Sequence, residues 1–141
     1  MRRPLPAAFL APGAPPSVAV AFGGYFLISA GCGNEVLTQI VSPNGSYKAV
    51  VFQRDCGATT GFSTQVSIVN KHSELGNSTG NVFVADTGHG SAPSGPGGGP
   101  VVAVQWRTPD HLVISHHGAA RVFKARSHTH GIEVRYESFA Q

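Results

Sequence analysis

The sequence predicts an all-β domain, either a small antiparallel sheet or a two-sheet sandwich of about six or seven strands. Apolar residues recur with a period near two from Val36 onward, and clusters of turn residues separate the apolar runs. Charged residues make up only 12% of the chain, which contains 18 glycines and 10 prolines. This balance favours short strands joined by turns, and no helical period of about 12 residues or more follows Cys32.

Seven segments carry the strand pattern. They are residues 47–54, 64–70, 81–85, 101–107, 111–116, 120–126 and 132–137. The last of them alternates most clearly, because charged residues separate Ile132, Val134 and Tyr136. We therefore expect one face of that strand in the core and the other in water.

Two turns divide these strands into hairpins, with the sequence SPNG at residues 42–45 and TPD at residues 108–110. Proline fixes φ, and Asn-Gly accepts the positive φ that hairpin turns require. The hairpins around both turns are similar to fragments of β-propeller blades. A blade needs about 40 residues and a propeller at least about four blades, so a closed propeller does not fit in 141 residues.

Residues 86–100, DTGHGSAPSGPGGGP, cannot form regular structure. Six glycines and three prolines in this stretch make its ordering costly in conformational entropy. The composition is typical of a linker and predicts a flexible loop, with a ligand lid as the alternative.

Residues 1–31 have the features of an export segment, and residues 32–141 are then the β domain. Two arginines follow Met1, and residues 17–30 are continuously apolar or small. This apolar run is shorter than the roughly 20 residues that a membrane-spanning helix needs. The pattern is therefore that of a secretory signal.

The SAGC run that ends at Cys32 resembles the lipobox of bacterial lipoproteins, although Ser29 stands where a large aliphatic residue is usual. The resemblance implies that Cys32 is lipidated and anchors the protein in the bacterial cell envelope, facing the periplasm or the exterior. An uncleaved signal that anchors the chain, ordinary cleavage and no export stay open as alternatives. A Cys32 without lipid can pair with Cys56 in an oxidising compartment.

The segment of residues 54–64, RDCGATTGFST, links two predicted strands and combines glycines, hydroxyl side chains and a thiol. Its amides and hydroxyls are suited to an anion or another polar ligand. The candidate binding residues are Asp55, Cys56, Thr59, Thr60 and Ser63. In one alternative Cys56 is a nucleophile or redox group with a histidine base. In the other the segment is a hairpin connection whose polar groups satisfy its own backbone.

Residues 47–68, YKAVVFQRDCGATTGFSTQVSI, resemble a stretch shared by an uncharacterised family of short bacterial envelope proteins that are predicted lipoproteins. The likeness extends from Cys32 to the region of Trp106 and residues 132–136. It implies an envelope location and adds no mechanism.

Seven histidines raise the possibility of a metal site. His116 and His117 on one strand could face His128 and His130 on another, as pairs that bind Zn²⁺ or Cu²⁺ do. However, adjacent residues of a strand point to opposite faces, and no cysteine or carboxylate supplements the histidines in a recognised spacing. We therefore expect exposed histidines near turns and assign no metal ligand.

The net charge and the missing catalytic motifs argue against a nucleic-acid-binding protein and against the common enzyme classes. The formal net charge is +3, and two of the basic residues are Arg2 and Arg3, so the remainder carries +1 and has no basic stripe for a nucleic acid. Phosphate-binding loops, nucleophile elbows and assignable carboxylate pairs are missing, so we assign no cofactor and no catalytic residue. The favoured interpretation is a non-enzymatic binding or structural module whose partner is another envelope protein. A small enzyme or redox protein that uses Cys56 and a periplasmic metal-binding module are the alternatives.

Overall fold

The computed structural model describes residues 31–57 and 61–140, and this part of the chain contains nine β-strands and no helix. The strands are β1 (Gly33–Val41), β2 (Tyr47–Asp55), β3 (Ser63–Asn70), β4 (Phe83–Asp86), β5 (Val102–Thr108), β6 (His111–His117), β7 (Arg121–Ala125), β8 (His128–Thr129) and β9 (Ile132–Phe139). The all-β prediction is confirmed. The predicted export segment lies outside the described residues apart from Gly31, and no membrane-spanning helix occurs in the part that is described.

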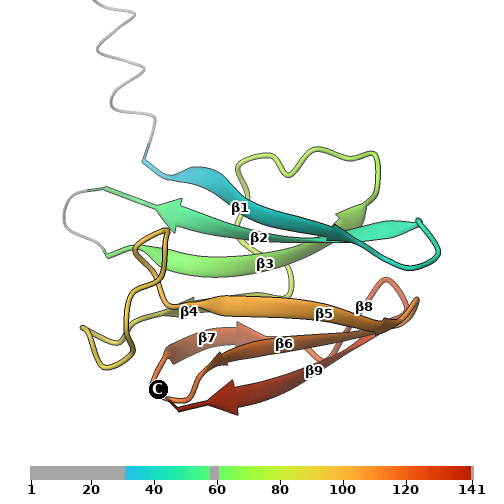
Figure 1. Ribbon diagram of the computed structural model, residues 1–141. Coiled ribbons are helices and arrows are strands. Elements are labelled where there is room, and N and C mark those ends of the chain that lie inside the picture. The colour runs from blue at the N-terminus through green and yellow to red at the C-terminus, as the bar shows by residue number, and fades with distance from the viewer. Residues whose placement is uncertain (1–30, 58–60, 141) are drawn as a thin grey trace, which may run out of the picture. The chain divides into compact units, whose positions relative to one another are not determined.

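The strands form two sheets, which is consistent with the predicted sandwich (Figure 1). The first sheet has the order β1-β2-β3-β4-β7 and the second the order β5-β6-β9-β8. All neighbouring strands are antiparallel except β6 and β9, which run parallel. The expected turns close the β1–β2 and β5–β6 hairpins, and β1 and β8 are strands that the sequence did not predict.

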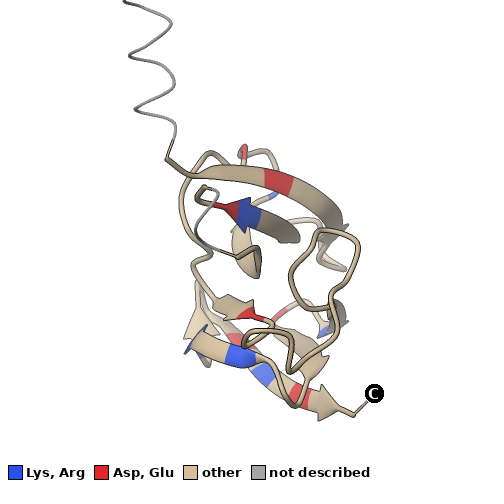
Figure 2. Ribbon diagram, turned by 90° about the vertical axis from the view of Figure 1, so that its left-hand side faces the viewer, with Lys and Arg blue, Asp and Glu red and all other residues tan. Residues whose placement is uncertain are grey.

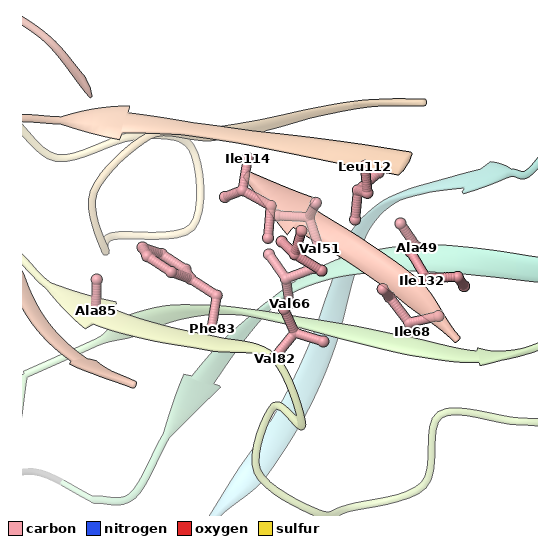
Figure 3. Packing of buried hydrophobic residues seen from close by; sticks show 11 residues of the cluster. Ala49, Val51, Val66, Ile68, Val82, Phe83, Ala85, Leu112, Ile114 and Ile132 are labelled. Atoms are coloured by element: carbon pink, nitrogen blue, oxygen red, sulfur yellow. The ribbon is translucent and has the colours of Figure 1, made fainter. Parts of the chain in front are cut away.

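The core lies where the facing side chains of the two sheets meet (Figure 3). It consists of Ala49, Val51, Val66, Ile68, Val82, Phe83, Ala85, Leu112, Ile114, Ile132 and Val134. Along β2, β3, β4, β6 and β9 these residues recur with a period of two, and Val82 directly precedes β4. Each large apolar side chain that is fully buried contributes about 1.5–3 kcal/mol to folding.

The outer face of the first sheet is also buried. Val50 and Phe52 have no exposed surface although they point away from the main core. The connection between β3 and β4 passes over this part of the sheet, and the buried side chain of Gln65 accepts a 2.7 Å hydrogen bond from the Gly80 amide (Figure 1). Ser67 accepts another from the Asn81 amide, so both buried polar side chains satisfy the backbone that covers them.

The segment of residues 86–100 is packed against the first sheet. The Gly95 amide donates a 2.6 Å hydrogen bond to the Gly99 carbonyl. A Cβ added at Gly99 would lie 2.6 Å from the Thr64 hydroxyl oxygen, so only glycine permits this approach. The linker-like composition therefore reflects close packing, and the prediction from it missed these contacts.

Candidate functional site

A disulfide joins Cys32 and Cys56 at the start of the β domain. The β1–β2 ladder pairs Gly33 with Asp55, so its next step places the two cysteines directly opposite each other. Of the alternatives for Cys32, the structure contains the disulfide. A thioether to diacylglycerol needs the same sulfur, so a molecule with this disulfide is not lipidated at Cys32.

The described residues of the predicted binding segment make hydrogen bonds within the segment and to neighbouring parts of the first sheet. The Asp55 carboxylate accepts a 3.0 Å hydrogen bond from the Gly57 amide, and the Ser63 hydroxyl accepts one of 2.8 Å from the side-chain amide of Gln65. Cys56 has no thiol in this state, because its sulfur is bonded to Cys32. A nucleophilic or redox role of Cys56 would therefore require this bond to open. Thr59 and Thr60 lie outside the described residues.

A shallow hollow of about 220 Å³ lies beside this segment, where β4 ends and β7 begins. It is lined by Gly61, Phe62, Asp86, Thr87, His89, Gly98 and Arg121. Arg121 binds the Asp86 carboxylate through two hydrogen bonds of 3.1 and 2.7 Å. This guanidinium holds the pKa of Asp86 below its usual value, with help from the Gly88 amide. Because Asp86 and Arg121 neutralise each other, these two side chains give the hollow no net charge that would attract an ionic ligand.

The four histidines considered for a metal site lie apart. On the β9 ladder His116 is opposite Ser138, whereas His128 is opposite Glu133. Five residues of a strand span roughly 17 Å, and β9 itself lies between the two histidine strands. His130 stacks on Tyr47 with 5.3 Å between the ring centroids. The metal hypothesis built on these residues is therefore wrong, and among the described residues no group of three or more histidine, cysteine or acidic side chains is arranged so that it could hold a metal ion.

His111 takes part in a polar cluster that the sequence did not indicate. Its Nδ1 lies 2.9 Å from the Asp110 carboxylate, and its Nε2 lies 2.9 Å from the Glu133 carboxylate. Asp110 also accepts a 2.7 Å hydrogen bond from the Thr108 hydroxyl. Hydrogen bonds from Thr108 and His111 lower the pKa of Asp110. The cluster is exposed and joins the β5–β6 turn to β9, and only the parallel register of β6 and β9 brings its members together.

The most unusual surface of the domain is β1. Val36, Leu37, Ile40 and Val41 are all exposed large apolar side chains, and Val36 and Val41 are 42% and 44% exposed. Glu35 is the only charged residue in the strand, as Figure 2 shows by a single red band along it. The strand forms one edge of the first sheet, so one of its sides has no neighbouring strand. An apolar edge strand of this kind is a typical template for pairing with another chain.

Comparisons with known proteins found no match among protein-family models, curated proteins or solved structures. The likeness of residues 47–68 to a family of envelope proteins remains a prediction from the sequence.

Proposed function

We propose that this chain is a non-enzymatic binding module of a bacterial cell envelope and acts outside the cytoplasm. The observation that carries the proposal is the apolar surface of β1, where four large side chains lie exposed on one edge strand. An apolar edge strand whose outer side is unpaired is a typical template for pairing with another chain. Sequence analysis had favoured a binding or structural module and had placed its candidate binding residues in the segment of residues 54–64, not on β1.

The location is supported by the disulfide between Cys32 and Cys56. Disulfides persist in oxidising compartments and are rare in the cytosol. This agrees with a secretory start within residues 1–31. Because Cys32 is engaged, we propose that membrane attachment, where it occurs, uses the uncleaved apolar segment and not a lipid on Cys32.

The first test concerns location and the state of the cysteines. The full chain is produced in a bacterial host, free thiols are blocked with an alkylating reagent, and the envelope fraction is analysed by mass spectrometry. We expect the protein in the envelope with neither cysteine alkylated and no added lipid mass. A cytosolic protein with two alkylated cysteines would refute the proposal.

The second test concerns binding. We expect native electrophoresis of solubilised envelopes to show the protein in a complex, and the Val36→Ser/Val41→Ser variant to migrate as a free chain. The matched control is Val122→Ser, which removes a 39% exposed valine from the opposite edge strand β7. Equal migration of the two variants would argue against β1 as the binding surface.

A further inference from the structure

The four edge strands of the two sheets differ in how well they are protected from pairing. Natural proteins protect edges with short strands, positive charges, prolines or bulges. β7 has five residues, including Arg121 and Lys124, and β8 has only two residues. β5 follows Pro100 and carries Arg107. Each of these edges therefore has at least one protective feature besides a bulge.

β1 is the exception. It has nine residues, contains neither a lysine nor an arginine nor a proline, and carries one charge at Glu35. Its protective feature is a bulge, since the register with β2 shifts between Val36 and Thr38. After this shift the strand pairs regularly with β2 up to Val41. The regular part, residues 38–41, is uncharged and exposed.

Contacts with β5, β2 and the β3–β4 connection fix β1 in place. The indole nitrogen of Trp106 on β5 donates a 2.9 Å hydrogen bond to the carbonyl oxygen of Ile40. The disulfide fixes the other end of the strand at Cys32, and Asn34 donates to the carbonyl oxygens of Gly76 and Ser78. A strand that is already fixed loses little conformational freedom when it pairs, so this edge is preorganised.

We propose that β1 binds a second copy of this chain, edge to edge and antiparallel, so that the first sheets of two molecules form one continuous sheet. This inference deepens the proposed function by naming the partner, and it rests on that function for the compartment in which the pairing takes place. A two-fold axis at Gln39 pairs residues 38–40 of the two strands with each other and closes the assembly at two copies.

The distribution of charge fits this occupant. With the axis at Gln39, the two Glu35 carboxylates lie at opposite ends of the new ladder, roughly 27 Å apart. At the axis the uncharged Gln39 of one copy lies opposite Gln39 of the other, and Ile40 lies opposite the uncharged Thr38, so no like charges are opposed. The residues after position 3 carry a formal charge of only +1, so repulsion between two copies is weak.

The experiment uses the full chain in an exporting bacterial host. A photoreactive phenylalanine analogue replaces Val41 on β1 or, as the matched control, Val122 on β7, since both valines are exposed on edge strands of the same sheet. We expect irradiation to give an adduct of two copies from position 41 and none from position 122. No two-copy adduct, equal yields from both positions, or adducts only with other proteins would overturn the inference.

Charge reversal then tests the two-fold pairing. Gln39→Lys alone and Gln39→Glu alone place like charges near the axis, so each is expected to lower the adduct yield from position 41 at least about tenfold. Co-expression of two differently tagged copies, one with each substitution, is expected to restore a mixed adduct. Failure of the mixed pair to form would overturn the inference. The disulfide of each variant, seen on a non-reducing gel, shows that the variant has folded.

The two proposals can fail separately. A two-copy adduct in a protein that stays in the cytosol refutes the envelope function and supports the pairing. An envelope complex that depends on β1 but contains no second copy supports the function and refutes the pairing.

Discussion

The hydroxyl of Thr64 donates a 2.6 Å hydrogen bond to the carbonyl oxygen of Pro100, and both residues are buried. The bond fastens the end of the glycine-rich segment to β3. In Thr64→Val this carbonyl loses its donor in a buried place, so we expect a loss of about 1–3 kcal/mol in the free energy of unfolding. Urea unfolding measures it. The control Thr38→Val replaces an exposed threonine on β1 and is expected to change stability by less than about 0.5 kcal/mol. Equal losses would contradict the role of the hydrogen bond.

Removal of the disulfide should destabilise the domain mainly because the unfolded chain gains conformational entropy. Cys32 and Cys56 are 24 residues apart, and closure of a loop of that length is worth about 3 kcal/mol. We therefore expect Cys32→Ser/Cys56→Ser to lose about that amount in urea unfolding. Treatment of the wild type with a reductant should give the same loss and should leave the double variant unchanged. A wild type that is unaffected by reduction would show that the bond does not constrain the chain.

Gly98 and Gly90 allow backbone strain to be separated from side-chain contact. Their φ values are +93° and +91°, but a Cβ at Gly98 would lie 2.5 Å from Phe62 Cδ2, whereas nothing lies within 4 Å at Gly90. Gly90→Ala is expected to cost about 1–2 kcal/mol from the left-handed backbone alone. Gly98→Ala should cost about 1–3 kcal/mol more because the new methyl group overpacks the ring. In the Phe62→Ala background the costs of Gly98→Ala and Gly90→Ala should become nearly equal. Thermal unfolding of both glycine variants, each with and without Phe62→Ala, measures these costs.

Phe83 is the largest side chain of the main core and has no exposed surface. Phe83→Ala is expected to lower the free energy of unfolding by about 3–5 kcal/mol, because it removes apolar surface and leaves a cavity between the sheets. The control is Phe123→Ala on β7, where the ring is 61% exposed and a loss below about 1 kcal/mol is expected. Similar losses at both positions in urea unfolding would contradict this assignment of the core.

The ion pair of Asp86 and Arg121 should make stability depend on pH. Because Arg121 holds the pKa of Asp86 below 3.8, the pair contributes stability that is fully present above about pH 4 and is lost as the pH falls through the lower pKa of the folded state. Asp86→Asn should therefore be less stable than the wild type at neutral pH, and the difference should shrink in acid. Unfolding between pH 2 and pH 7 checks this. In an Arg121→Gln background the part of the difference that depends on pH should largely disappear.

The parts of the fold that follow a local pattern could be predicted from the sequence. The alternation at Ile132, Val134 and Tyr136 identified β9, and the turns after Val41 and Arg107 identified two hairpins. β1 was missed because apolar and polar residues come in pairs along VLTQIV, residues 36–41, and do not alternate singly. Apolar side chains therefore lie on both faces of the strand. Its edge position depends on the order of strands in the sheet.

The candidate sites were predicted less well because their contacts are distant in the sequence. The cluster at His111 depends on a parallel register with Glu133, and the packing of Gly99 depends on a hydroxyl 35 residues earlier, at Thr64. Glycine content describes freedom of the unfolded chain and does not show what the folded chain packs against. The disulfide was one alternative for Cys32 beside lipidation and an uncleaved signal, and the pairing of β1 with β2 is what brings Cys32 and Cys56 together.

The parallel pairing of β6 with β9 also constrains the order of events in folding. Among the described residues β9 comes last in the chain, yet it lies between β6 and β8 in the middle of the second sheet. The β5–β6 hairpin therefore cannot complete its pairing when it is synthesised. The edge of β6 that carries Leu112 and Ile114 stays unpaired until β9, about 20 residues later, has been synthesised. A nascent chain that stalls before Ile132 presents β6 with an unpaired edge, and unpaired edges of this kind favour aggregation.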